Sequence, residues 1–371
     1  MIYELGKVGM HVVNKRWFQF FVFFILAFTL ILLISVTDFI FFPFIKIVGS
    51  VAVPIIGAGI LYYLTKPLMY FFERLKINRI ISIVLVFVVM ILLGVFVYMY
   101  IAPIAQQQFR NLIDNVPKMV DWAQDMISLW QSNQTAIPDQ VNKAINDFTN
   151  NLQSHIDSVI NYLFGFIGQI IGFVTSLVLV PFFLFFMLKD GEKLVPFITQ
   201  IFSKKKAANI RALLSKLDAT LTSFIQGQLI VSFAVGVLLF IGYLIIGLNY
   251  SLTLALFAMV MNVIPFAGPF IAVIPALIVG AFQEPIMVVW VALVMIAAQQ
   301  IESNLISPNV MGRALDLHPL TVITVILAAG SIAGFLGILF AVPFYAVIKT
   351  IILHFYQTYV DSKKNKEDAL I

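Results

Sequence analysis

The side chains best suited to chemistry lie in a short polar run that ends an apolar helical stretch, Gln299-Gln300-Ile301-Glu302-Ser303-Asn304. Gln299 and Glu302 are three residues apart and therefore share one helix face, whereas Asn304 lies off that face unless the helix ends first. A carboxylate held at membrane depth is costly and is a functional candidate, able to carry a proton or bind a monovalent cation. The alternative is an interfacial Glu302 that only caps the helix or pairs with Arg313.

Two long apolar segments, Leu252–Phe282 and Leu320–Leu353, carry helix breakers in their middles. Aligning their Leu-Thr starts also superposes Pro275 on Pro343. A pair of Gly/Pro-interrupted segments points to a transporter binding site, because broken helices expose backbone groups to a solute or ion. The alternative is proline kinking or close packing at glycine. The candidate pathway residues here are Asn262, Pro265, Gly268 and Pro269 in the first segment, and the candidate packing or gating residues are Gly330, Gly334 and Gly337 in the second.

Two further polar groups interrupt apolar sequence. Gln226 and Gln228 flank Gly227 at the start of a span, where they are predicted to hydrogen-bond a neighbouring helix in a packing or gating role. Asp190-Gly191-Glu192 directly follows the apolar run Phe182–Leu188. A glycine there predicts a helix end, and an inner gate is the alternative.

Patterns typical of enzymes are absent from the sequence. It has no Walker A, HExxH, GxSxG or dinucleotide-binding pattern. It has no cysteine, and its four histidines do not pair at metal-ligand spacing. We therefore expect no enzyme activity, catalytic residue, metal or cofactor, and any transport must be secondary, driven by a gradient. Basic residues lie in short loops beside apolar spans, which argues against nucleic-acid binding.

The composition places the chain in a lipid bilayer. Of 371 residues, 61% are hydrophobic and 11% are charged, against about 45–50% and about 25% in soluble domains. Backbone groups in lipid must be satisfied internally, so only helices or a closed barrel can span it. Continuous apolar runs such as Trp17–Val36 favour helices over barrel strands, which alternate. The sequence therefore predicts an all-α polytopic membrane protein.

About eight transmembrane segments follow from runs of roughly 20 apolar residues. They are Trp17–Val36, Phe39–Leu64, Ile80–Ile101, Val159–Leu188, Leu229–Leu248, Leu252–Phe282, Ile286–Ala298 and Leu320–Leu353. The two broken segments either cross singly, giving eight spans, or are re-entrant hairpins, giving six spans plus two hairpins. The expected regions are a three-span part (1–101), an extracytoplasmic helical insertion (102–158), a fourth span (159–188), a cytoplasmic amphipathic segment (189–228), a C-terminal transport region (229–353) and a cytoplasmic tail (354–371).

Lysine and arginine set the orientation, because they gather in cytoplasmic loops. They cluster before the first span, at 66–79, at 189–216 and in the tail. We therefore expect a bacterial inner-membrane protein with both termini in the cytoplasm. Acids outnumber bases in 102–158, which fits the outer side. Two apolar stripes, Leu112–Trp130 and Val141–Val159, predict a helical hairpin there. Its role is gating or subunit contact, or it merely packs on itself or on the membrane.

Four stretches carry a resemblance to a known family. They are FFMLKDGEKL (Phe185–Leu194), NVIPFAGPFIAVIPA (Asn262–Ala276), QQIESNLISPNVMG (Gln299–Gly312) and LHPLTVITVILAAGSIAGFLGILFAVP (Leu317–Pro343). In order and spacing they closely resemble the autoinducer-2 exporter (AI-2E) family, over nearly the whole chain and most weakly at 102–158. The resemblance implies an eight-span transporter fold and homo-oligomerisation, with a pentameric form described for the family. It also implies export of autoinducer-2, a small hydrophilic signal, or exchange of sodium or lithium for protons.

Three functions follow as hypotheses. The first is a secondary exporter of a small polar molecule of the autoinducer-2 type, bound near Asn262, Gln299 and Asn304. The second is a sodium (lithium)/proton antiporter that uses Glu302. The third is a non-transporting membrane scaffold whose working part is the outer hairpin. The expected partners are accordingly the lipid bilayer, a small polar solute or monovalent cation, and further copies of the chain.

Overall fold

A computed structural model describes residues 16–132, 179–311 and 318–368. Every regular element within these ranges is a helix, which confirms the all-α prediction. The helices are α2 (Arg16–Val36), α3 (Asp38–Arg74), α4 (Arg79–Phe96), η1 (Val97–Ile101), α5 (Ala102–Ser132), α8 (Val180–Thr199), α9 (Lys204–Ile245), α10 (Ser251–Met261), α11 (Ala267–Gln283), α12 (Met287–Ile301), η3 (Glu302–Ile306), α13 (Ser307–Met311) and α14 (Pro319–Asp368).

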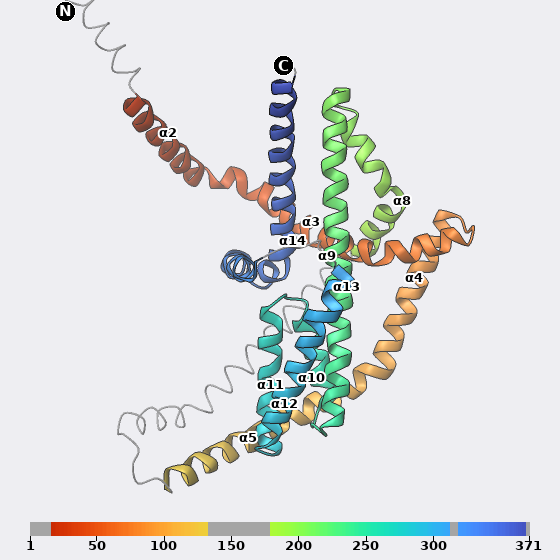
Figure 1. Cartoon of the computed structure of the whole chain (residues 1–371), viewed down its shortest axis with the longest axis vertical. Helices are drawn as coiled ribbons and strands as arrows, with labels where there is room; N and C mark the ends of the chain where they lie inside the picture. Colours follow the sequence, from red (N-terminus) through yellow and green to blue (C-terminus); the bar gives the residue numbers. More distant parts are fainter. Residues whose placement is uncertain (1–15, 133–178, 312–317, 369–371) are drawn as a thin grey trace, which may run out of the picture.

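Five helical stretches of the described residues are long and apolar enough to cross a membrane: Gly49–Arg74, Arg79–Asn115, Lys204–Ile245, Met287–Met311 and Leu336–Val360. Four shorter apolar helices accompany them, including Trp17–Leu33. Helix α2 projects away from the rest of the molecule (Figure 1), and its apolar side chains, such as Trp17 and Phe21, are exposed. The chain is therefore an all-α polytopic membrane protein.

Helix α9 is the axis of the fold. Its 42 residues extend about 63 Å at about 1.5 Å per residue, roughly twice the hydrocarbon thickness of a bilayer. Helices α10, α11 and α12 lie along its C-terminal half, and the end of α14 lies along its N-terminal half (Figure 1). The predicted amphipathic segment 189–228 is thus not separate, because α8 ends at Thr199 and α9 runs unbroken from Lys204 into the predicted span at Leu229.

The glycine expected to end a helix after Leu188 does not do so. Helix α8 continues through Asp190, Gly191 and Glu192 to Thr199, so that prediction was wrong. A Cβ on Gly191 would lie 3.4 Å from the Tyr62 hydroxyl of α3. The small residue therefore marks the contact between α8 and α3 rather than a helix end.

The largest core cluster of described residues lies between α9 and the helices beside its C-terminal half. Val231, Val235, Leu239 and Tyr243 of α9 are buried in it with residues of α10, α11 and α12. Glycine brings the backbones together, as is common between membrane helices. A Cβ on Gly236 would lie 2.7 Å from the Met259 Cβ, and one on Gly242 would lie 2.4 Å from Val294 Cγ1.

The first broken segment is a helical hairpin. Helix α10 ends at Met261, and the chain turns through Phe266, whose φ is 62°, into α11. The two ends of the hairpin meet, because Gln283 at the end of α11 donates to the Gly247 carbonyl (2.9 Å) and accepts from the Asn249 amide (2.9 Å). The segment therefore enters and leaves at the same end of the bundle, which excludes a single crossing.

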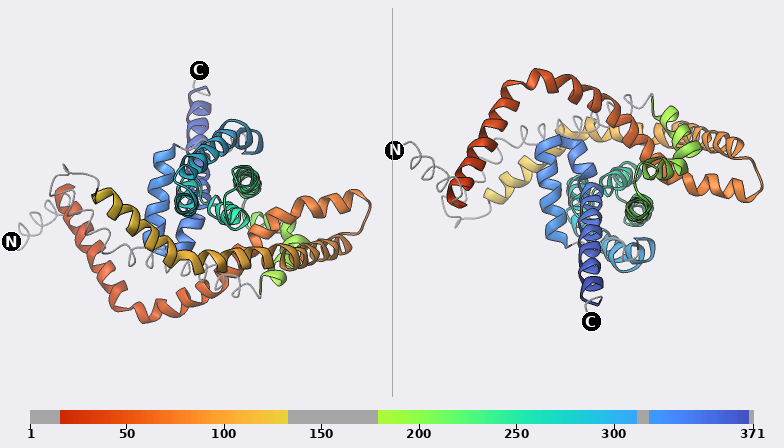
Figure 2. Two further views of the ribbon diagram at one scale, coloured as in Figure 1. Left: turned by 90° about the horizontal axis from the view of Figure 1, so that it is seen from below. Right: turned by 90° about the horizontal axis from the view of Figure 1, so that it is seen from above.

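The second broken segment also folds back. Helix α14 bends at Ala333 and at Gly334, whose φ is 57°. Val322 and Ile326 of the first arm pack with Ala341 and Val342 of the second, and the two arms lie side by side in both views of Figure 2. The first segment is therefore a hairpin, whereas the second arm of the second segment belongs to Leu336–Val360, which is long and apolar enough to cross a membrane.

The two turns correspond in position to within one residue. With Leu252 aligned on Leu320, Phe266 falls on Gly334, and both have left-handed backbone. Met261 likewise falls on Ala329, and each of their carbonyls closely approaches a glycine across its turn, Gly268 and Gly337 respectively. The sequence echo between the segments is therefore also an echo of backbone geometry.

Helix α5 crosses the end of the bundle where the first hairpin opens (Figure 1). The Gln108 Oε1 atom accepts hydrogen bonds from the Thr253 amide and hydroxyl, both 3.1 Å, at the start of α10. The predicted stripe Leu112–Trp130 falls on α5. The second stripe, Val141–Val159, and the span residues 159–178 lie outside the described residues.

Candidate functional site

Gln226 and Gln228 of α9 each hydrogen-bond a different helix. Gln226 Nε2 donates to the Tyr63 carbonyl of α3 at 2.6 Å. Gln228 Nε2 donates to the Asn262 carbonyl at the end of α10, also at 2.6 Å. Both glutamines thus bond a neighbouring helix, and the bond from Gln228 places the middle of α9 against the turn of the first hairpin; the packing or gating role stays a prediction.

The hydrogen bond from Gln228 occupies a backbone carbonyl that the break in the helix would otherwise leave free. Helix α10 stops at Met261, so the Asn262 carbonyl has lost the regular helical donor four residues on. Gln228, which is 6% exposed, supplies that donor. One of the backbone groups expected to be free at the break is therefore occupied by the protein itself.

Gly227 lets α13 reach this position. A Cβ on Gly227 would lie 2.6 Å from Met311 Cγ, so α9 and α13 touch where the two glutamines point to other helices. The Gln226-Gly227-Gln228 triplet thus joins α3, α10 and α13 at one point of α9.

The side chains of Asn262, Gln299 and Glu302 meet beside this junction. Asn262 is 2% exposed, and its side chain lies against the Glu302 carboxylate. Its Nδ2 atom nevertheless has no hydrogen bond of good geometry to any described residue. Gln299 Nε2 donates to Glu302 Oε2 at 3.1 Å, as their shared helix face predicts. The site therefore combines a half-buried carboxylate, a neutral donor bound to it and a buried amide nitrogen with a free hydrogen-bonding position.

Backbone geometry shapes the site on both sides. Glu302 begins a π-helical turn, η3, and such turns are frequent at functional sites. Across from it, Gly268 cannot carry a side chain, because its Cβ would lie 2.1 Å from the Met261 carbonyl oxygen. Pro265 lies in the turn before α11, and Pro269 lies beside Gly268 at the start of α11. These three residues form the hairpin rather than contribute polar atoms to the site.

Asn304 does not join the site. It lies on the exposed face of η3, where its amide donates to Gln300 Oε1 at 2.9 Å. Gly330, Gly334 and Gly337 form the turn of the second hairpin. The contact between the hairpins is apolar instead, with Ile264 from the first turn packed among Val322 and Ile326. Arg313, the base considered for Glu302, lies outside the described residues.

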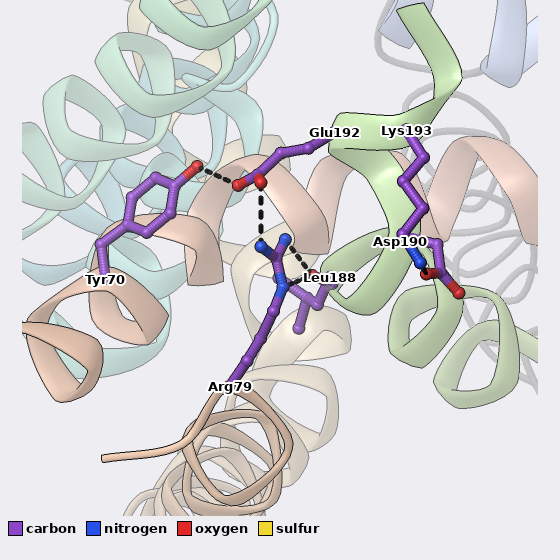
Figure 3. A network of polar contacts seen from close by, with 6 residues as sticks. All are labelled: Tyr70, Arg79, Leu188, Asp190, Glu192 and Lys193. Atoms are coloured by element: carbon purple, nitrogen blue, oxygen red, sulfur yellow. Dashed lines mark hydrogen bonds and ion pairs between the residues drawn. The ribbon is translucent and has the colours of Figure 1, made fainter. Parts of the chain in front are cut away.

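A second polar network joins α3, α4 and α8 (Figure 3). Arg79 donates from Nη1 to Glu192 Oε2 (2.9 Å) and from Nη2 and Nε to the Leu188 carbonyl (2.8 and 3.1 Å), and the Tyr70 hydroxyl donates to Glu192 Oε1 (3.0 Å). The hydrogen bond from Arg79, followed by that from Tyr70, lowers the pKa of Glu192. Nearby, Asp190 forms an ion pair with Lys193 at 2.7 Å, and this hydrogen bond lowers the pKa of Asp190.

A further ion pair, Lys66 with Asp218 at 3.4 Å, joins α3 to α9. Lys66 and Arg79 come from one loop region predicted to be cytoplasmic, and Glu192 and Asp218 come from another. The structure brings these two regions together, just as it brings α5 to the α9–α10 turn at the opposite end. The loops predicted to share a side therefore do lie together.

Sequence reasoning named Asn262, Gln299 and Glu302 among its pathway residues, together with Asn304, but did not predict that these three would meet or which partners Gln226 and Gln228 would have. It also missed the network around Arg79 and two buried hydroxyls of α9, Ser232 and Tyr243, that have no partner among the described residues. The sequence did contain a signal for these two. Both are polar residues on an otherwise apolar face of one helix, and they are eleven residues apart, which is about three turns of 3.6 residues.

Known proteins were compared with the whole chain. The family described as AI-2E family transporter matches residues 18–357. YueF of Bacillus subtilis (strain 168), a transport protein by its name, is 34% identical over 85% of this chain and 87% of its own length. YrrI of the same organism, also named for transport, is 28% identical over 87% and 94%. The permease PerM of Escherichia coli (strain K12) is 29% identical over 73% and 77%.

Proposed function

This chain belongs to the AI-2E family of transporters, and we propose that it is a secondary transporter whose solute binds at the site that Asn262 and Glu302 form. The solute is a small polar molecule of the autoinducer-2 type, and the direction is export across the bacterial inner membrane. The membrane architecture and the relatives support a transport role, and the geometry beside Gln228 supports the position of the site.

One observation carries the proposal: the buried Nδ2 atom of Asn262 lies against the Glu302 carboxylate but makes no hydrogen bond of good geometry to any described residue. A buried donor left without a partner costs about 1–3 kcal/mol, so a native protein keeps one for a reason. A hydroxyl or carbonyl oxygen of a small polar solute would accept that hydrogen bond. The adjacent Glu302 carboxylate would accept a hydrogen bond from a hydroxyl of the same solute.

Uptake of labelled autoinducer-2 into inverted vesicles tests this function. Because one lost hydrogen bond is worth about 1–3 kcal/mol, Asn262→Ala should lower the initial rate by roughly 5- to 100-fold. Asn304→Ala is the matched control, since Asn304 lies on the exposed face of the next helix and bonds only Gln300 among the contacts described. Equal rates for both variants, or no uptake above empty vesicles, would remove the proposal.

A sodium (lithium)/proton antiporter is the second candidate, favoured by the half-buried Glu302 carboxylate whose direct partner is the neutral Gln299. With no charged partner among the described residues, such a carboxylate can exchange a proton for a monovalent cation. A pH-sensitive dye in proteoliposomes, read on addition of sodium or lithium, tests this reading. Glu302→Gln should abolish the signal, and an unchanged signal would exclude Glu302 from the coupling.

The remaining alternative is a non-transporting scaffold, which gains support only if both assays match empty vesicles. We also propose that the chain forms a homo-oligomer, pentameric by the family resemblance, in which the separate apolar helix α2 contributes to subunit contact. Native mass spectrometry with and without residues 1–36 checks this, and a monomer in both preparations would contradict it.

A further inference from the structure

Among the described residues, three buried side-chain atoms lack a hydrogen-bond partner: Asn262 Nδ2, Ser232 Oγ and Tyr243 Oη. Ser232 is 1% exposed and Tyr243 is 0% exposed. Burying a hydroxyl without a partner is unfavourable, and a core built for stability alone would carry alanine and phenylalanine at these positions. Asn262 belongs to the proposed solute site, so Ser232 and Tyr243 require their own explanation.

The two hydroxyl-bearing residues continue from the site along one face of α9. Ser232 follows Gln228 by one helical turn, and Gln228 bonds Asn262. Tyr243 is three turns further on, which places it about 16 Å along the axis and about 20° around it from Ser232. It lies near the turn between α9 and α10, to which α5 is bound. The line therefore leads from the solute site to the end of the bundle predicted to face outward.

Ser232 also differs from two threonines of the same helix. A serine or threonine inside a helix commonly bonds the carbonyl four residues earlier. Thr220 and Thr222 of α9 do so, to Lys216 and Asp218, at 2.8 and 2.7 Å. Ser232 makes no such bond, so its hydroxyl remains available to a group between α9 and the helices packed on it.

We infer that the face of α9 carrying Ser232 and Tyr243 lines the outward half of the solute route, an inference that rests on the proposed function. The route is closed in this structure, because α10 packs against Gly236, which lies between the two hydroxyls about one helical turn beyond Ser232. A Cβ there would lie 2.7 Å from the Met259 Cβ. Water and solute reach the two hydroxyls when α9 and α10 separate at this contact.

Removing each hydroxyl tests the inference through two opposed effects. Ser232→Ala and Tyr243→Phe should each raise the melting temperature by roughly 2–4 °C, because an unpaired buried group is lost, and should each lower uptake several-fold. Ser50→Ala and Tyr98→Phe are the controls, since both residues are exposed and lie on α3 and η1 away from the line. Unchanged uptake in both test variants would overturn the inference.

A second test measures water access without any substrate. The chain has no cysteine, so single cysteines report their own surroundings, and a thiol reacts only as the thiolate that water permits. Ser232→Cys should react with a charged methanethiosulfonate at least about tenfold faster than Ile230→Cys, whose position at similar depth is exposed on the outside of the bundle. Equal rates would overturn the hydrated route.

The two proposals fail separately. A reactive Ser232→Cys in a protein that moves no solute upholds the hydrated face and rejects the proposed transport function. An unreactive Ser232→Cys in a protein whose transport depends on Asn262 keeps the solute site and rejects this route.

Discussion

Gln226 compensates for Pro67, although the two residues lie on different helices. Proline has no N–H, so Pro67 leaves the carbonyl four residues earlier, that of Tyr63, without its helical donor. That carbonyl accepts from Gln226 Nε2 at 2.6 Å. The proline in α3 and the glutamine in α9 therefore form one structural unit, as do the break after α10 and Gln228.

This pairing predicts a non-additive pair of substitutions. Gln226→Ala should lower the free energy of unfolding by about 1–3 kcal/mol, because a carbonyl inside the bundle loses its donor. In a Pro67→Ala background, the new N–H at position 67 donates to the Tyr63 carbonyl within α3. Gln226→Ala should then lower the free energy of unfolding by clearly less. Thermal unfolding in detergent of the two single variants and the double variant gives the coupling. Strictly additive costs would contradict the pairing.

The hairpin turns predict a graded series of glycine substitutions. In Gly268→Ala and Gly337→Ala the added methyl meets a backbone carbonyl, at 2.1 and 1.9 Å, so each should destabilise by about 3 kcal/mol or more. Gly330→Ala meets the Ile338 side chain at 2.9 Å, which can move, and should cost less.

Gly59→Ala is the control for this series, because nothing lies within 4 Å of its Cβ position. It should be neutral or stabilise by up to about 1 kcal/mol, since alanine favours helix over glycine. Melting temperatures rank the four variants. A Gly268→Ala protein as stable as Gly59→Ala would show that the turn is not formed as described.

The Arg79–Glu192 pair predicts acid sensitivity. The pKa of Glu192 is lowered from its ordinary value of 4.5 by the hydrogen bond from Arg79. The stabilisation is therefore complete above that value and is lost as the pH falls through the lower pKa of the folded state. Half of the Glu192 side chain is exposed, so the contribution is modest, about 0.5–1 kcal/mol at neutral pH.

Melting curves from pH 7 down to roughly pH 3 measure this loss. Glu192→Gln should be less stable than the parent at pH 7 and should approach it in acid. Asp190→Asn is the comparison, because Asp190 pairs with an exposed Lys193 on its own helix and should have a smaller effect. Parallel curves for Glu192→Gln and the parent would contradict the assignment.

The orientation predicts one-sided labelling. Glu284 lies in the loop between α11 and α12, and Lys205 lies in the first turn of α9; both are exposed. On intact cells, an impermeant maleimide should label Glu284→Cys and spare Lys205→Cys, and membrane disruption should allow both to react. The absence of native cysteine removes background. The reverse pattern would invert the proposed topology.

The sequence predicted those features that depend on residues close together in the chain. Apolar runs predicted helices such as α2 and α4, and the three-residue spacing placed Gln299 on Glu302. Breakers also located both turns, although whether the segments crossed or folded back depended on contacts such as Gln283 with Gly247. The predictions that failed or fell short depended on distant partners. Gly191 has no local reason to continue a helix, yet packing against Tyr62 allows it.

The start of α9 was missed for a related reason. The charged first half of α9 meets its apolar second half near Leu229, where the sequence predicted a boundary between water and lipid. No turn lies at this boundary, and the helix continues through it unbroken. The partners of Gln226 and Gln228 lie 163 and 34 residues away along the chain. No spacing rule within one helix reaches that far.

The unbroken length of α9 has a mechanical consequence. Gly227 lies near the midpoint of the helix and has neighbours on three sides. The first hairpin packs against one end of α9, and the C-terminal part of α14 packs against the other. A rigid lever that turns about a central fulcrum swings its two arms in opposite directions. A tilt that parts α9 from α10 at one end would therefore also move α9 relative to α14 at the other end, so that the two ends of the helix could not move independently.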